Sequence, residues 1–133
     1  MNKQAASKEQ ANRATVQRYF AAINNQHKTL EMLEHLVTDP DLVEHIAFFE
    51  AGFAGYALIP DEIIAEGDKV AVRFHTDQTH TGEFLGVAPT GRRTSVDGII
   101  IYRLEDDKIA EHWMQADLLG LMRTLQEPQP VTG

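Results

Sequence analysis

The sequence of 133 residues contains no cysteine, and this absence excludes disulfides, thiolate nucleophiles and cysteine-ligated metals. Long apolar runs are also missing: no segment approaches 18 apolar residues, and no apolar stretch follows a basic start. We therefore expect neither a membrane-spanning helix nor a signal peptide, and the cytoplasm is the expected location.

Basic residues are few, and the formal net charge is -8. Arg92 and Arg93 form the one adjacent pair of Lys or Arg residues. Nucleic acids and anionic membranes are bound by clustered Lys and Arg side chains that displace counterions. The sequence therefore argues against both as partners.

The composition is that of one ordinary globular domain. Hydrophobic residues make up 43% and charged residues 24% of the chain, so a packed core is expected. A single domain over residues 1–133 would bury roughly two-thirds of its unfolded surface. Residues 1–6 are small and polar, and residues 127–133 contain two prolines, so we expect both ends to be loose.

Helical patterns occupy the N-terminal third. A capping-box pattern at residues 7–10 predicts a helix start, and an apolar stripe follows at Val16, Tyr19, Phe20 and Ile23. Thr29 can cap a second helix, which the Asp-Pro pair at 39–40 should end. Residues 42–46 could form a short strand and residues 47–55 a short helix.

From residue 57 onwards the apolar period changes to two. The pattern predicts a strand over 57–65, with Pro60 at an edge or a bulge, and a turn at Gly67. It also predicts a long strand from Lys69 towards Phe84 and another over 93–105. Helices followed by consecutive antiparallel strands indicate an α+β fold.

The most informative stretch is a hairpin near the C-terminus, in which strand 98–104 and a polar turn lead into a second strand from Ile109. The second strand carries His112 and Trp113, and Asp117 follows it. Strand parity puts Trp113 and Asp117 on one face and His112 on the other. Unless a bulge lies between them, His112 and Asp117 cannot share a pocket.

Residues 66–122 carry a family resemblance. The Gly82–Gly86 and Pro89–Arg92 segments, the Glu-His-Trp string at 111–113 and the segment 117–122 together resemble the SnoaL-like polyketide cyclases, within the nuclear transport factor 2-like superfamily. The resemblance implies a strongly curved, mixed or antiparallel sheet wrapped on about three N-terminal helices. This cone would enclose a pocket for an apolar small molecule.

The resemblance also implies an activity: cofactor-independent acid/base chemistry next to a carbonyl, such as intramolecular aldol cyclisation. Asp117 corresponds to the acid/base residue of the family, and His112 to the histidine of its Glu-His-Trp string. A carboxylate in this role needs an apolar neighbour that raises its pKa, which Trp113 could supply. The alternative for Asp117 is the N-cap of the helix that follows it.

Four further residues are candidate substrate contacts. His80 and Phe84 lie in a string that the family uses beside its pocket. His45 stands where many relatives have a polar pocket residue. Tyr19 belongs to the apolar stripe, and its hydroxyl needs a partner if it is buried. Core or surface roles stay open for all four.

We expect no metal and no nucleotide cofactor. His75 and Asp77 share one parity along their strand while His80 has the other, so three ligands do not converge. No glycine-rich turn for phosphate leads from a strand into a helix.

Two other functions stay open. The same fold could serve as a non-catalytic ligand-binding or dimeric interaction module, or as a hydrolase, dehydratase or isomerase.

We also expect a homodimer formed through the sheet, because the face away from the helices would otherwise leave apolar residues of strand 98–104 uncovered.

Overall fold

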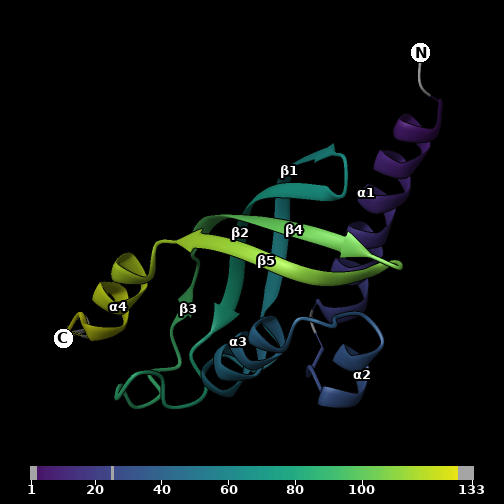
Figure 1. Ribbon diagram of the computed structural model, residues 1–133. Helices are drawn as coiled ribbons and strands as arrows, with labels where there is room; N and C mark the ends of the chain where they lie inside the picture. The colour runs from purple at the N-terminus through teal and green to yellow at the C-terminus, as the bar shows by residue number, and fades with distance from the viewer. Residues whose placement is uncertain (1–2, 25, 129–133) are drawn as a thin grey trace.

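The computed structural model describes residues 3–24 and 26–128. Three helices come first, five strands follow and a fourth helix ends the described chain (Figure 1). The helices are α1 (Lys3–Ile23), α2 (Leu30–Glu34), α3 (Pro40–Gly52) and α4 (Leu118–Gln126). The strands are β1 (Ala57–Glu66), β2 (Lys69–Thr79), β3 (Arg93–Thr94), β4 (Asp97–Glu105) and β5 (Lys108–Ala116).

The strands form one antiparallel sheet in the order β1-β2-β4-β5, and the short β3 pairs with β2. Figure 1 shows α4 at the opposite end of the sheet from α1 and α2. The predicted α+β class is confirmed. Among the described residues, no helix is both long and apolar enough to span a membrane.

The apolar stripe of α1 is buried as predicted, with Val16, Tyr19, Phe20 and Ile23 all at most 3% exposed. These side chains pack against the inner face of the sheet in the main hydrophobic cluster. The helix begins at Lys3 rather than at the predicted capping box, so residues 3–6 are helical. Residues 1–2 and 129–133 of the predicted loose ends lie outside the described residues.

The predictions for residues 29–55 were partly wrong. Thr29 caps α2 as expected, its side chain accepting from the Met32 N–H. Pro40, however, does not end that helix: it stands at the start of α3, where its missing N–H costs nothing, and Asp39 is the N-cap. The expected strand at 42–46 is therefore helical.

The strands follow their predicted positions more closely than their predicted lengths. β1 has a register shift between Pro60 and Glu62 and lies at the edge of the sheet, as expected. β2 ends at Thr79 and does not continue to Phe84. The predicted strand 93–105 is divided into β3 and β4.

The loop after β2 leaves the sheet because it packs against α3. The Thr81 and Gly82 N–H groups both donate to the Gly52 carbonyl. A Cβ atom at Gly82 would lie 2.1 Å from the Ala51 carbonyl oxygen, so this approach requires glycine.

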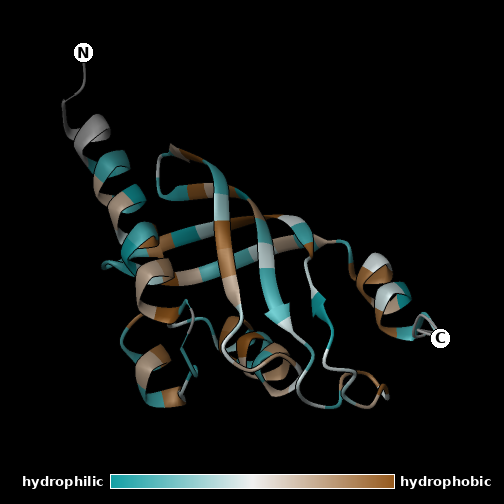
Figure 2. Cartoon of the chain, turned by 180° about the vertical axis from the view of Figure 1, so that it is seen from behind, coloured by the Kyte–Doolittle hydropathy of each residue, from teal (hydrophilic) through white to brown (hydrophobic). Residues whose placement is uncertain are grey.

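Two hydrophobic clusters fill the interior, and Figure 2 shows hydrophobic and hydrophilic residues alternating along the strands that bound them. The first cluster joins α1 and α3 to the inner face of β2 and β4. The second lies towards α4 and consists of Phe49, Phe53, Tyr56, Phe84, Val96, Leu121 and Leu125.

Candidate functional site

An apolar pocket lies between α1, α3 and the inner face of the sheet, with a volume of about 50 Å³. The first residue of α4, Leu118, also contributes to its wall. Most lining side chains are aliphatic or aromatic. They include Tyr19, Ile23, Leu42, Ile46, Phe49, Tyr56, Phe74, Ile100, Tyr102, Met114 and Ala116.

β5 presents alternate side chains to this pocket, as strand parity predicted. Met114 and Ala116 line the pocket, and His112 lies on the same face. Trp113 lies on the outer face with 47% of its surface exposed. Trp113 is therefore not among the described residues that line the apolar pocket, because its parity directs the indole to the other face, and its role as a substrate contact stays a prediction.

Asp117 caps α4. Its Oδ1 accepts from the Gly120 N–H at 2.8 Å, which is the alternative considered for this residue from sequence. The carboxylate is exposed and lines an open hollow on the outer side of the sheet with Asp61, Arg73 and Asp97. Asp117 is not among the described residues that line the apolar pocket.

His112 and Asp117 are separated as strand parity predicted. The β4–β5 register runs without a shift from the Gly98–Ala116 pair to the Tyr102–His112 pair. The bulge that could have brought the two side chains together lies instead near the turn, between Arg103 and Leu104. The two predicted catalytic residues therefore do not share a pocket.

His112 is paired with Asp39, a residue that the sequence analysis considered only as the end of a helix. The His112 Nδ1 lies 2.7 Å from the Asp39 Oδ2, and the two side chains are 15% and 10% exposed. Asp39 Oδ1 accepts from the Asp41 N–H at 3.0 Å and from the Leu42 N–H at 3.4 Å. The N-cap of α3 thus also fixes an imidazole on β5.

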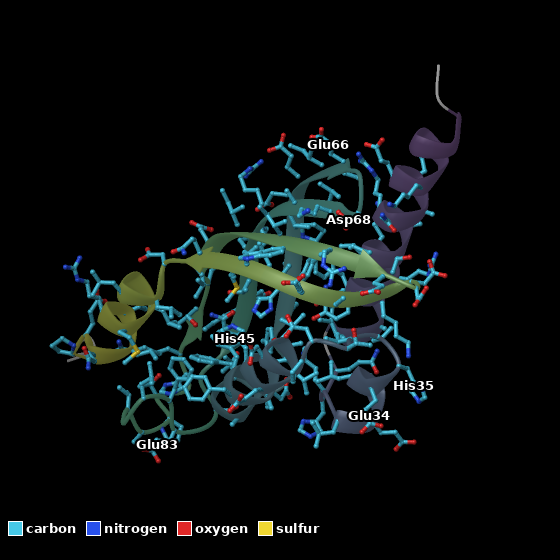
Figure 3. All side chains as sticks on the ribbon, viewed as in Figure 1. Glu34, His35, His45, Glu66, Asp68 and Glu83 are labelled. Atoms are coloured by element: carbon cyan, nitrogen blue, oxygen red, sulfur yellow. The ribbon has the colours of Figure 1, made fainter. Side chains whose placement is uncertain are left out.

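His45 joins this pair to the pocket. It lines the pocket, and its ring centroid lies 6.5 Å from that of His112. Its contact with a substrate stays a prediction. Figure 3 shows the His45 side chain between α3 and β5. Burial lowers the pKa of His45 from its ordinary 6.5, and the positive charge that His112 can carry lowers this pKa further.

Tyr19 also lines the pocket, where its ring packs edge-on against Tyr102 with 5.8 Å between centroids. Burial raises the pKa of the Tyr19 hydroxyl well above its ordinary value, and the neighbouring Tyr102 and Tyr56 raise it further. The phenol is therefore neutral throughout the physiological range.

His80 and Phe84, the other two predicted substrate contacts, are buried outside this pocket. Phe84 packs in the second cluster, and His80 lies against Phe53 with 5.3 Å between ring centroids. The His80 Nδ1 accepts from the Thr90 N–H at 3.1 Å, so a neutral ring carries its proton on Nε2. Neither His80 Nε2 nor Gln78 Oε1 has a hydrogen-bond partner among the described residues.

The residues considered for a metal site lie apart. His75 pairs with Asp61 at 2.9 Å, and Asp77 pairs with Arg93 at 2.6 Å. His80 follows the last residue of β2 and is fully buried. In the described ranges 3–24 and 26–128, no three His, Asp or Glu side chains are placed to hold a metal ion.

Comparison with known proteins identifies related sequences. A family model described as SnoaL-like polyketide cyclase matches residues 14–125. The aklanonic acid methyl ester cyclase AcmA of Streptomyces galilaeus is 35% identical over 89 residues, which is 66% of this chain. The alignment spans 62% of AcmA, so the matched part covers less than two-thirds of that relative.

Solved structures share the fold over most of the chain. A candidate SnoaL-like polyketide cyclase from Jannaschia sp. CCS1 superposes with a TM-score of 0.77 at 23% identity, covering 91% of this chain and 95% of the other. AclR of Streptomyces galilaeus, a candidate hydroxylase, superposes with a TM-score of 0.76 at 28% identity, covering 93% and 87%. The fold is thus shared by proteins assigned different chemistry.

Proposed function

Because this chain belongs to the SnoaL-like polyketide cyclase family, we propose that it closes a ring in a carbonyl-bearing polyketide by moving a proton next to the carbonyl. One observation carries the proposal: the apolar pocket has a titratable imidazole, His45, in its wall. An apolar wall weakens the solvation of charge, and a group that changes protonation near neutral pH is suited to acid/base catalysis.

The proposed substrate class comes from the relatives. The name of AcmA states that it acts on aklanonic acid methyl ester, and we extend the class of polyketide methyl esters to this chain. A pocket of about 50 Å³ is smaller than the roughly 300–1,000 Å³ of sites that enclose a drug-sized ligand. Because of this small volume, either only part of such an ester enters the pocket, or a wall residue such as Leu118 moves to enlarge it.

An assay of ring closure by the purified protein tests this proposal. The purified protein is incubated with polyketide methyl esters, including aklanonic acid methyl ester, and products are separated by chromatography and weighed by mass spectrometry. An intramolecular aldol closure gives a product of unchanged mass and altered retention. A rate equal to that in buffer for every ester would contradict the proposal.

His112 and Asp117, the acid/base candidates from the sequence, enter the proposal differently. His112 lies beside His45 and is paired with Asp39, so it can act on the pocket through its neighbour. The role of Asp117 stays a prediction, and its placement at the cap of α4 gives it a structural function in any case.

A homodimer is also part of the proposal. A row of mainly apolar side chains crosses the outer face of the sheet in direct register, and charged pairs such as Arg103–Glu111 at 2.6 Å lie beside it. Two of its members, Ile64 and Trp113, are 57% and 47% exposed. A second copy would cover the row, which consists of Ile64, Ala71, Ile101 and Trp113.

The same face supports the second candidate function, a dimeric binding module without catalysis. Such a module would bind the esters without converting them. We propose the cytoplasm, the location expected from the sequence, for either function.

A further inference from the structure

The pocket wall contains few groups that can exchange a proton. Its three tyrosines, Tyr19, Tyr56 and Tyr102, have pKa values raised mainly by burial, so they stay protonated at neutral pH. The Thr76 hydroxyl accepts from the Val96 N–H at 2.9 Å and does not titrate in this range. Among the described lining residues, His45 is the imidazole, the side chain whose ordinary pKa of 6.5 is nearest neutrality, and burial lowers that pKa.

His45 also connects the pocket to the outside. Besides lining the pocket, it borders an outward hollow formed with Asp41, Glu44 and Phe48 on the same helix. A proton taken from a molecule in the pocket can therefore leave to solvent through the other side of the ring. Among the described residues, the carboxylates of Asp41 and Glu44 lie at this hollow, and the imidazole of His112 on β5, paired with Asp39, faces His45 from the sheet.

The geometry around His112 gives this residue a fixed orientation. Its Nδ1 faces the Asp39 carboxylate at 2.7 Å, and the carboxylate is itself held by the Asp41 and Leu42 N–H groups. In a neutral ring whose Nδ1–H donates to the carboxylate, Nε2 carries the lone pair. A carboxylate that fixes the tautomer of an imidazole in this way is a recurrent arrangement in acid/base catalysis.

We propose that His45 is the residue that exchanges a proton with the substrate, and that His112, oriented by Asp39, is its positioning residue. This inference rests on the proposed function and specifies its site. The neutral His45 removes a proton from the carbon next to one carbonyl. The electron pair of that C–H bond then forms a carbon–carbon bond to a second carbonyl carbon, whose oxygen takes the proton back from His45. The product is an isomer of the substrate, and no other reactant is consumed.

Two assays separate the inference from the proposed function. The first is ring closure of polyketide methyl esters. The second is exchange of the C2 protons of methyl 3-oxooctanoate in D₂O, followed by proton NMR, which needs proton removal but no cyclisation. Both are run with the wild type and with His45→Gln. The matched control is His35→Gln, the same substitution at an exposed histidine that follows α2.

We expect His45→Gln to lower the catalysed rate in both assays by about 100-fold or more, while His35→Gln stays within about threefold of the wild type. Circular dichroism and the melting temperature verify that both variants fold. If the wild type exchanges protons without closing a ring, and His45→Gln loses that exchange, the result would support His45 and refute the cyclase. Ring closure at an undiminished rate by folded His45→Gln would overturn the inference, and a wild type inactive in both assays would overturn both.

His112 is tested by the pH profile, which a merely structural role would not move. The positive charge that His112 can carry opposes protonation of His45. In His112→Gln that opposition is gone and the Asp39 carboxylate is left without its partner, so the acid limb of kcat/KM should shift to higher pH. An unchanged acid limb in a folded variant would remove His112 from the proposed site.

Discussion

Replacement of Asp117 separates a helix cap from a catalytic acid/base, and the structure sets the expected size of each effect. Asp117 Oδ1 accepts from the Gly120 N–H at 2.8 Å, and the side chain is exposed. Asparagine keeps an oxygen that can accept the same hydrogen bond, so Asp117→Asn should change the free energy of unfolding by less than about 0.5 kcal/mol. Asp117→Ala loses the cap and should cost about 1 kcal/mol, or about 4 °C in Tm for a domain of this size.

Turnover decides between the two roles. Because the carboxylate lies outside the apolar pocket, we expect Asp117→Asn to keep ring-closing activity within about threefold of the wild type. Asp97→Asn, in the same outer hollow, controls for the loss of one negative charge there. Asp117→Asn with an unchanged Tm and a turnover reduced by about 100-fold would refute our reasoning and make Asp117 the acid/base, as the family resemblance implies.

Four further changes have expected outcomes. A Cβ at Gly98 would lie 2.6 Å from the Phe74 Cζ, so Gly98→Ala should destabilise by about 1–3 kcal/mol in urea unfolding, and an unchanged midpoint would contradict this. Leu118→Ala should widen the pocket and lower KM for bulky esters; an equal or higher KM would show that this wall does not limit entry. Trp113→Glu should convert a dimer to a monomer, as measured by light scattering; a wild type that is monomeric at micromolar concentration would refute the dimer proposal. The pKa of His45 is lowered in the folded state, so the unfolded state binds this proton more readily and stability should fall as pH drops through 6.5; His45→Gln should reduce that fall, and an identical pH dependence would contradict it.

Local patterns predicted much of the fold because their causes are local. The alternation of β5 separated the face of Trp113 from the face of His112 and Met114, and β-strand geometry alone imposes that separation. Which of the two faces lines the pocket did not follow from the alternation. Pro60 marked an edge strand because it has no N–H for the ladder. Arg103 and Glu111 lie opposite each other on the predicted hairpin and form an ion pair at 2.6 Å, which neighbouring antiparallel strands allow.

Features that depend on distant segments were missed. Asp39 was interpreted as part of a helix stop, although an acidic residue before proline is equally suited to an N-cap with proline at the first helical position. Its second partner, His112, is 73 residues away, and no local spacing indicates that contact. The path of residues 80–92 likewise depends on α3, which the sequence analysis did not predict as one continuous helix.

Blocking the pocket tests the central claim most directly, namely that ring closure occurs inside it. Met114 lines the pocket from β5, and a strand position accepts an aromatic residue, so Met114→Trp should fill the space while the protein stays folded. Wild-type and variant rates of ring closure with a polyketide methyl ester are compared, with the melting temperature as the control for folding. The account predicts that the wild type converts the ester to a product of unchanged mass and that the filled variant falls close to the rate in buffer. Ring closure by folded Met114→Trp at the wild-type rate would contradict it.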